Sequence, residues 1–291
     1  MKVLITGSSG LLGGRLIDKL SQNHDIRITQ TRDFYKYINN DLDYLIHAAS
    51  PNNQDCKNTS ITDQYIIQTQ RMLDHCIKSD VKNIFFLSST QVYKNIQSDS
   101  ITEEAEINLD ETNEYQTLKL RVEELFTKLS TDTTRNVVVL RISNGYGYPV
   151  DLRAKCWHLL VMDVCKQAIQ TGKVKLRSNG EQYLDFIPVS AICQVFEKII
   201  DGQTYIKSGI YNLTTGNPLK IKDFITMIIG IIEGVIDDKV CIEYNSLDNM
   251  ISRKSNLLNT KLKDLDLNPS VNHNDEIVRL IDFCIANFKK K

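Results

Sequence analysis

Tyr115 and Lys119 are the two residues whose types and spacing most directly suggest chemistry. They stand four positions apart in a stretch with helical periodicity, so both side chains lie on one face of the predicted helix. A tyrosine hydroxyl titrates near pH 10 and is a poor base at neutral pH. An ammonium group about 4 Å away contributes about 4 kcal/mol at an effective dielectric constant near 20, and half of that energy lowers the tyrosine pKa by about 1.5 units. The pair predicts a tyrosine that transfers protons near neutral pH, with a surface tyrosine above a surface lysine as the simpler alternative.

A glycine pattern near the start of the chain predicts a phosphate-binding turn. A run of branched apolar residues, 3–5, ends at Gly7, and leucine and isoleucine recur at helical spacing from Leu11 onward. Glycine lets this turn close and lets the backbone approach a pyrophosphate, while the helix N-terminus offers amide donors. An ordinary strand–turn–helix corner is the alternative, but this context favours a bound dinucleotide. The residues predicted to contact the cofactor here are Gly7, Ser9, Gly10, Leu11, Leu12 and Gly13.

The residues after a second predicted strand, 26–30, bear on the choice between NAD and NADP. A nucleotide-binding fold places the residue that contacts the adenosine ribose about 20 positions beyond the glycines. Arg32 and Asp33 occupy this place. An acidic side chain would bind both ribose hydroxyls, whereas arginine favours a 2′-phosphate. Because Arg32 comes first, we expect NADP, with NAD as the alternative. If Arg32 is only solvated, it does not favour either cofactor.

Two further predicted strands end in small or hydroxyl-bearing residues. The strand over residues 43–50 contains His47, Ala48 and Ala49 near its end, and the strand over 83–87 is followed by hydroxyl groups at residues 88–90. Open parallel sheets bind ligands at the carboxyl ends of their strands. We therefore expect Ala48 and Ala49 to leave room for the cofactor. His47 is expected beside the cofactor as a scaffold, with a direct chemical role as the less favoured alternative.

Composition excludes several classes of function. The net charge of −1 provides no global field for nucleic acid or an anionic membrane. The seven cysteines show no paired C-x-x-C spacing, which favours reduced thiols over disulfides or a zinc site. The longest late apolar run, residues 225–236, is too short and too interrupted to span a membrane. We expect a cytoplasmic protein without a metal centre.

Strands and helices alternate along most of the chain and predict an α/β fold. A helix is expected over about residues 62–78, a polar loop over 94–112, a helix from residue 114, and a strand over 137–142. The alternation then loosens. Residues 150–180 predict a helix and a short strand, and 185–201 a short strand and a helix. A strand at 210–213, a helix from about residue 220 and a final helix over 275–288 complete the pattern.

Together these motifs resemble the extended short-chain dehydrogenase/reductases, the nucleotide-sugar epimerase/dehydratase family. The resemblance covers about residues 1–215. It implies a Rossmann domain with a doubly wound parallel sheet, residues 1–150 completed by about 185–205. It also implies a smaller C-terminal α/β substrate domain, residues 151–184 and 206–291, and a nucleotide-sugar substrate, and it allows a homodimer. The matching motifs are Thr6-Gly7-x-x-Gly10-x-x-Gly13, His47-x-Ala49, Ser88-Ser89-x-x-Val92-Tyr93, Tyr115-x-x-x-Lys119 followed by Glu123, and Leu140-Arg141-x-x-Asn144-x-Tyr146-Gly147, with looser matches at Asp185-Phe186-Ile187-Pro188-Val189 and Tyr211-Asn212-Leu213.

The same resemblance implies roles for individual residues. Ser89, three positions before the Val-Tyr pair, would hold the reacting oxygen, and Tyr115 would exchange its proton while hydride moves between the sugar carbon and nicotinamide C4. Tyr115 and Lys119 would also contact the cofactor, Lys119 at the nicotinamide ribose. The implied substrate contacts are Ser89, Thr90, Gln91, Asn144 and Arg253.

Departures from the family pattern narrow the expected reaction. The segment before residue 43 is short, which removes a strand and its adenine contact, and Tyr65 stands near the usual position of a cofactor-side asparagine. Leu184 replaces an arginine that usually grips the substrate diphosphate, for which Arg253 compensates in part. Neither Thr90 nor Gln91 is the acidic residue of the dehydratases. We therefore expect a 4-keto sugar reductase using NADPH, with a 4-epimerase that retains NAD as the alternative. A nucleotide-sensing protein without catalysis is the alternative from another class.

Overall fold

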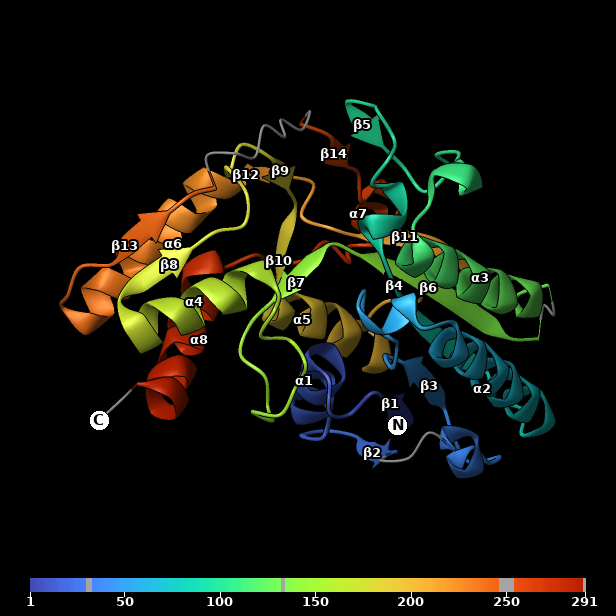
Figure 1. The fold of residues 1–291 in the computed structure, drawn as a ribbon. Coiled ribbons are helices and arrows are strands. Elements are labelled where there is room, and N and C mark those ends of the chain that lie inside the picture. Colours follow the sequence, from blue (N-terminus) through green and yellow to red (C-terminus); the bar gives the residue numbers. More distant parts are fainter. Residues whose placement is uncertain (30–32, 132–133, 246–253, 290–291) are drawn as a thin grey trace.

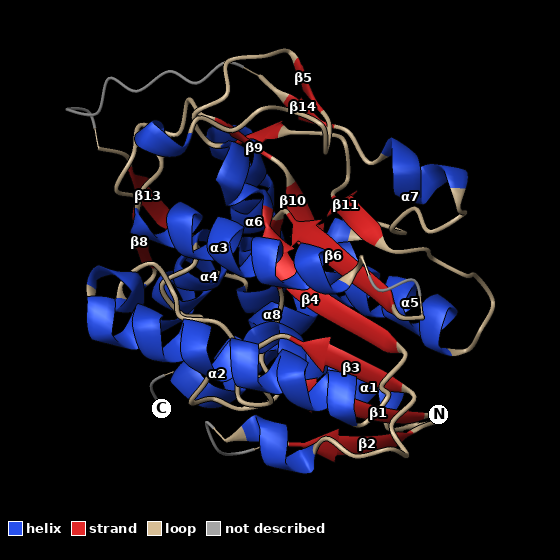
Figure 2. Ribbon diagram, turned by 90° about the vertical axis from the view of Figure 1, so that its right-hand side faces the viewer, coloured by secondary structure: helices blue, strands red, loops and turns tan. Residues whose placement is uncertain are grey.

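A six-stranded parallel sheet forms the centre of the molecule, in the strand order β11-β6-β4-β3-β1-β2 (Figures 1 and 2). The structure, a computed structural model, describes residues 1–29, 33–131, 134–245 and 254–289. Every neighbouring pair in the central sheet is parallel. This confirms the predicted doubly wound, Rossmann-like α/β fold. The strands are β1 (Lys2–Thr6), β2 (Asp25–Ile28), β3 (Tyr44–His47), β4 (Asn83–Ser89), β6 (Asn136–Ile142) and β11 (Gly209–Leu213).

Helices cover both faces of this sheet (Figure 1). α1 (Leu11–Leu20) and α5 (Val189–Ile200) pack together on one face, and α2 (Thr59–Lys78) and α3 (Glu114–Leu129) pack together on the other. Successive strand residues point to opposite faces. Thus Val3 and Ile5 belong to the core under α1, whereas Leu4 belongs to the core under α2 and α3. Burial on both faces explains why these strands are almost continuously apolar.

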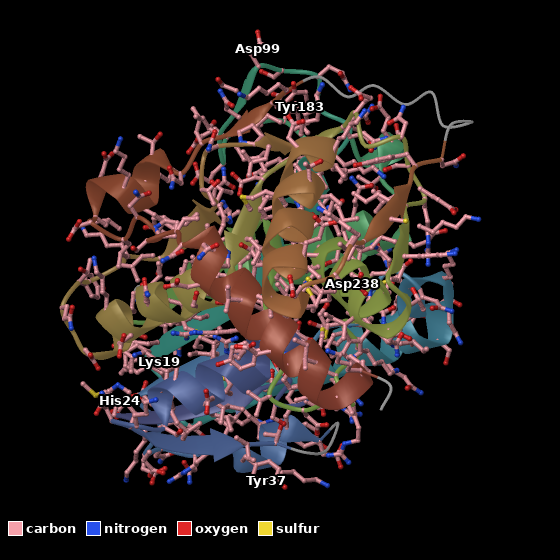
Figure 3. The ribbon with its side chains drawn as sticks, turned by 90° about the vertical axis from the view of Figure 1, so that its left-hand side faces the viewer. Lys19, His24, Tyr37, Asp99, Tyr183 and Asp238 are labelled. Carbon is pink, nitrogen blue, oxygen red and sulfur yellow. The ribbon has the colours of Figure 1, made fainter. Side chains whose placement is uncertain are left out.

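The later part of the chain adds three long helices and several short strand pairs. α4 (Leu160–Thr171), α6 (Ile221–Ile236) and α8 (His273–Phe288) contact one another, and Figure 3 shows α8 crossing α6. One apolar core runs from the α1 face of the sheet into these helices. The remaining elements are the pairs β7 (Asn144–Tyr146) with β10 (Phe186–Pro188), β8 (Lys173–Lys175) with β13 (Cys241–Glu243), β9 (Tyr183–Leu184) with β12 (Leu219–Lys220) and β5 (Ser100–Ile101) with β14 (Asn256–Leu257), and the short helix α7 (Thr260–Asp264).

The expected long elements are present, with their ends shifted by a few residues. α2 begins at Thr59 because Asn58 accepts a hydrogen bond from the Ser60 amide and caps the helix. The strand expected over 43–50 ends at His47. The loop expected over 94–112 contains β5 and a single 3-10 turn, because residues 100–101 pair with the distant strand β14. The proposed domain boundaries stay a prediction.

β2 is an edge strand of the central sheet. It connects to β3 through a short segment that contains one 3-10 turn, Phe34–Tyr37. Arg27 on β2 donates to both oxygens of Asp41 at 2.7–2.8 Å. The described residues between β2 and β3 form no further strand, so β2 has no neighbour on its outer side in this part of the chain. Within the described part of the chain, no helix has both the length and the apolar character to cross a bilayer.

Candidate active site

The turn between β1 and α1 requires glycine at two positions. Gly7 has φ +75°, and a Cβ atom there would lie 2.7 Å from the Ala49 nitrogen. A Cβ atom on Gly13 would lie 2.2 Å from the Gly7 oxygen. Gly10 is the N-cap of α1 and provides no side chain to cap it, so the first amide groups of the helix are available to an anion. The turn fits the pyrophosphate of a dinucleotide, although contacts with a cofactor stay a prediction.

A closed ring of four hydrogen bonds joins the end of β1 to the end of β3. The Ala49 amide donates to Thr6 Oγ1 at 3.2 Å, and Thr6 Oγ1 is 2.8 Å from His47 Nδ1. His47 Nε2 is 3.0 Å from the Tyr65 hydroxyl, which donates to the Ala49 carbonyl oxygen at 2.8 Å. The Tyr65 proton is thus committed to Ala49, so His47 Nε2 must donate and His47 Nδ1 must accept. We call these residues the His47 ring.

The environment of His47 agrees with its neutral state. Its side chain is completely buried, and burial, helped by the positive charge of Lys119, lowers the pKa of His47 to about 3. Both ring nitrogens are occupied by hydrogen bonds. In this arrangement His47 orients Thr6 and Tyr65, which bond the Ala49 backbone, and it has no free nitrogen for proton transfer. Its place beside a cofactor stays a prediction.

The three predicted catalytic residues lie together at the carboxyl end of β4. Burial raises the pKa of Tyr115, and a side-chain hydrogen bond with Ser89 partly offsets this rise. Lys119 is 4 % exposed and donates from Nζ to the Leu87 carbonyl oxygen at 3.1 Å. Burial lowers the pKa of Lys119 to about 8, against the opposing effect of the Glu123 carboxylate. The arrangement provides a half-buried phenol, a hydroxyl facing it and a buried amine beneath it.

One expectation about this pair is wrong. The sequence suggested that Lys119 lowers the pKa of Tyr115, but burial raises that pKa instead. The Lys119 ammonium lies 5.7 Å from the centroid of the Tyr115 ring and is bound to Leu87, so it acts at the ring and not through close contact with the hydroxyl. The alternative of a surface lysine is also wrong, because Lys119 is buried.

The predicted substrate contacts form a second group beside Ser89. Gln91 Nε2 donates to Asn144 Oδ1 at 3.3 Å, and Asn144 Nδ2 donates to the Asp185 carbonyl oxygen at 2.9 Å. The carbonyl oxygen of Gln91 accepts from Gln116 Nε2 at 2.9 Å. Thr90 is buried at the start of the same turn. The structure therefore brings Gln91 and Asn144 together and orients their side chains.

Two predicted contacts cannot be placed, and a third position is apolar. Arg32 and Arg253 lie outside the described residues. Leu184, on β9, packs half-buried against the apolar core opposite Leu219 of β12. Nothing charged stands at position 184 to hold a diphosphate.

A buried polar network beneath the site has no role in the sequence-based mechanism. Arg141 donates to both Glu123 oxygens at 2.6–3.1 Å, and Glu123 also accepts from Ser88 Oγ at 2.5 Å. Arg141 Nη1 donates to the Tyr93 hydroxyl at 2.6 Å, which donates to Asn212 Oδ1 at 2.8 Å. We call Ser88, Tyr93, Glu123, Arg141 and Asn212 the anchor network. A charged residue inside the apolar strand 136–142 was the signal available in the sequence, because a buried arginine needs a partner.

The start of α3 was also recognisable from sequence. Asn113 and Gln116 form a reciprocal capping box, in which each side chain bonds the other residue's backbone amide. The pattern Asn-x-x-Gln before a helical run predicts such a start. This box fixes the first turn of the helix that carries Tyr115. By contrast, the roles of Thr6 and Tyr65 depend on contacts across the fold and had no signal in the local sequence.

Known proteins share both the sequence pattern and the fold. A sequence profile described as the NAD dependent epimerase/dehydratase family matches residues 3–214. Among solved structures, RMD from Pseudomonas aeruginosa complexed with NADPH has a TM-score of 0.79 and 17% identity over 98% of this chain and 99% of that chain. UDP-glucose 4-epimerase from Bifidobacterium longum, in complex with NAD+ and UDP, has a TM-score of 0.78 and 21% identity over 99% of each chain.

A third similar structure is the UDP-N-acetylglucosamine 4-epimerase from Methanobrevibacter ruminantium, in complex with UDP-N-acetylmuramic acid. It has a TM-score of 0.79 and 18% identity over 98% of each chain. At these identities the solved structures establish the fold, and the profile match over most of the chain establishes the family. The glycine turn, the His47 ring and the Ser89–Tyr115–Lys119 group all lie within the matched residues. The chain belongs to the NAD dependent epimerase/dehydratase family.

Proposed function

We propose that the protein reduces a 4-keto group on a nucleotide-activated sugar, with Tyr115 as the general acid. The observation that carries this proposal is the group of side chains at the carboxyl end of β4, in which the Tyr115 hydroxyl faces Ser89 and the buried Lys119 lies beneath the tyrosine ring. A tyrosine whose pKa is raised by burial is protonated at neutral pH. It therefore suits the donation of a proton to an oxygen that gains negative charge.

Each residue of the site has a separate role in the reduction. A dinucleotide on the glycine turn would supply the hydride. Ser89 donates a hydrogen bond to the substrate oxygen and holds it beside Tyr115, which delivers the proton. Lys119 keeps a positive charge beneath the ring and stabilises the tyrosinate that remains. Gln91 and Asn144, already joined by a hydrogen bond, provide amide groups that orient the sugar.

The neighbours of Ser89 make elimination the less favourable reaction. A dehydratase needs an acidic group near the substrate, and positions 90 and 91 are threonine and glutamine. Thr90 is buried, and the Gln91 amide is bound to Asn144. We favour NADPH as the reductant because of Arg32. A 4-epimerase with retained NAD uses the same three catalytic residues and is the second candidate.

Purification and single-turnover kinetics test this proposal. The ultraviolet spectrum of the protein and of its extract distinguishes the candidates: tightly retained NAD indicates the epimerase, and exchangeable NADPH the reductase. With a 4-keto nucleotide sugar, Tyr115→Phe should slow NADPH oxidation by at least about a hundredfold, the scale of a lost acid–base group. Tyr205→Phe is the matched control, because Tyr205 is 68 % exposed and lies outside the site.

The outcomes separate catalysis from sensing. Tyr115→Phe should still bind NADPH, because the change removes only one hydroxyl. If that variant retains most of the wild-type rate, the acid–base role of Tyr115 is wrong. If the wild type binds a dinucleotide but turns over no nucleotide sugar, a nucleotide-sensing protein becomes the better description.

Replacement of Arg32 tests the cofactor preference. Arg32→Ala should raise the dissociation constant of NADPH about 10- to 150-fold and leave that of NADH nearly unchanged, since one charge-assisted hydrogen bond contributes about 1.5–3 kcal/mol. Isothermal titration with both cofactors measures the difference. Equal losses for both would exclude a contact between Arg32 and the 2′-phosphate.

A further inference from the structure

The anchor network holds the residue that precedes Ser89. Glu123 lies one helical turn after Lys119 on α3, and the two side chains bind successive residues at the end of β4. Lys119 Nζ donates to the Leu87 carbonyl oxygen at 3.1 Å, and Ser88 Oγ donates to Glu123 at 2.5 Å. The helix that carries Tyr115 is thus tied directly to the strand that carries Ser89.

The same network holds the far end of the turn that follows Ser89. Tyr93 ends the 3-10 turn Thr90–Tyr93. Arg141, which binds Glu123 through two nitrogens, donates from Nη1 to the Tyr93 hydroxyl at 2.6 Å, and its guanidinium carbon lies 4.9 Å from the Tyr93 ring centroid. Residues 89–92 therefore lie between two residues that are bound to one ion pair.

Burial makes this arrangement rigid. Glu123, Arg141 and Tyr93 are each at most 5 % exposed, and Asn212 is completely buried. Removal of one partner from a buried ion pair leaves an uncompensated charge at low dielectric, so the pair resists separation. Satisfied buried networks also restrict each member to one geometry.

We propose that the Glu123–Arg141 ion pair is a positioning device for catalysis, which fixes Ser89 on β4 relative to Tyr115 and Lys119 on α3. The inference rests on the proposed function of that group. Glu123 and Arg141 contact none of the reacting atoms and act through Ser88, Tyr93 and Lys119.

The pKa of Lys119 can be measured, and a purely structural role of Glu123 would leave that pKa unchanged. The groups that face Lys119 are Glu123 on its own helix, Tyr115 one turn earlier, Cys56 in the turn Asp55–Lys57 and His47 on β3. Among them, the Glu123 carboxylate raises the pKa of Lys119 against burial. Glu123→Gln removes this effect and leaves the Arg141 cation unpaired, so the Lys119 pKa should fall further.

Titration of Lys119 by carbon-13 NMR on lysine-labelled protein tests the charge effect and requires no substrate. The Lys119 resonance is assigned with Lys119→Met. In Glu123→Gln the Lys119 pKa should be lower than in the wild type, and in Tyr93→Phe it should be unchanged, because only a hydroxyl is lost. The turnover number with a 4-keto nucleotide sugar should fall about ten- to a hundredfold in both, the cost of misplaced reacting groups, with little change in KM.

Glu276→Gln is the matched control, since Glu276 forms another buried ion pair, with Arg15 at 2.9 Å, away from β4 and α3. This variant should lose stability, while its Lys119 titration and the pH dependence of its turnover number should match those of the wild type. If Glu123→Gln does not fold, Tyr93→Phe and Arg141→Lys, which keeps the charge but loses the two-pronged contact, carry the test.

Folded Glu123→Gln with an unchanged Lys119 titration, or folded variants with wild-type turnover numbers, would overturn the proposal. The NMR titration also separates the two ideas. A wild type without turnover refutes the proposed function, whereas the effect of Glu123 on Lys119 is still measured.

Discussion

His47 shows how one side chain can be held neutral by its surroundings. The carbonyl oxygen of Ala49 can only accept, so the Tyr65 hydroxyl donates to it and His47 Nε2 donates to Tyr65. Neutral His47 then accepts from the Thr6 hydroxyl at Nδ1. A protonated imidazole would put a second donor against the Thr6 hydroxyl inside the core. Thr6 would then have to turn its own proton away from His47. Protonation of His47 is therefore incompatible with the hydrogen-bond directions of the native His47 ring.

This conflict predicts an acid-sensitive fold. The pKa of His47 is lowered to about 3 in the folded protein, against about 6.5 in the unfolded chain, so the unfolded state binds more protons between these values. The stability due to neutral His47 is present above pH 6.5 and is lost as the pH falls. Between pH 7.5 and 5 the free energy of unfolding should fall by about 2 kcal/mol from this group.

Urea unfolding at the two pH values measures the loss. His47→Gln should lose about 2 kcal/mol less than the wild type over the same interval. His158→Gln is the control, because His158 is exposed and should leave the wild-type difference intact. An unchanged pH dependence in His47→Gln would show that another group causes the acid sensitivity.

At the scale of elements, the glycine turn shows how closely a helix can approach a strand. A Cβ atom on Gly13 would lie 2.2 Å from the Gly7 oxygen, so α1 would have to move away from β1. That displacement would also move the helix N-terminus that faces the expected pyrophosphate.

Gly13→Ala should therefore abolish the thermal stabilisation that NADPH gives and lower the melting temperature of the free protein. Gly230→Ala in α6 is the matched control, because a Cβ atom there meets nothing within 4 Å. It should leave the NADPH effect unchanged and stabilise the helix by up to about 1 kcal/mol. Differential scanning fluorimetry with and without NADPH compares them; a normal NADPH shift in Gly13→Ala would contradict the close-packing argument.

The sequence predicts those helices and strands whose burial leaves a regular pattern of apolar residues within the element itself. The spacing of apolar residues predicted α3 and the run of branched residues predicted β6, since burial of one face or both faces leaves a periodic trace. The pair β9–β12 has only two residues per strand, and its register depends on Leu184 meeting Leu219 across the fold. No local pattern specifies such a contact.

The same distinction applies to the candidate site. Ser89, Tyr115 and Lys119 were predicted from motifs, and the structure brings them together. The direction of the Tyr115 pKa could not be predicted, because burial decides it and burial depends on the packing of α3 against β4. The partners of Arg141 likewise come from α3 and from the turn after β4.

At the scale of the whole molecule, Glu276 joins three helices. From α8 it accepts a hydrogen bond from Arg15 on α1 at 2.9 Å and from the Ser190 amide in the first turn of α5 at 3.2 Å. A Cβ atom on Gly147 would lie 2.2 Å from its carboxylate, so the chain passes close beside it. The carboxylate also lies at the positive end of α5. Glu276 therefore connects the C-terminal helix to the helix of the glycine turn.

Glu276→Gln should lower the free energy of unfolding by about 3–5 kcal/mol, because it leaves the buried Arg15 cation without its counter-charge. Glu124→Gln is the control, since its ion pair with Lys128 is exposed and should contribute less than about 1 kcal/mol. Denaturant unfolding measures both. A loss in Glu276→Gln no larger than in the control would show that this connection does not stabilise the fold.

The position of β11 in the chain has a consequence for synthesis on the ribosome. β11 pairs with β6, although residues 143–208 separate the two strands in sequence. Until residue 213 emerges, a nascent chain can assemble five strands but exposes the edge of β6, all of whose residues are buried in the finished protein. An open apolar edge invites pairing with other chains. Arrested nascent chains ending near residue 200 should therefore depend on chaperones and be cleaved by protease near β6, whereas chains that have released β11 should resist.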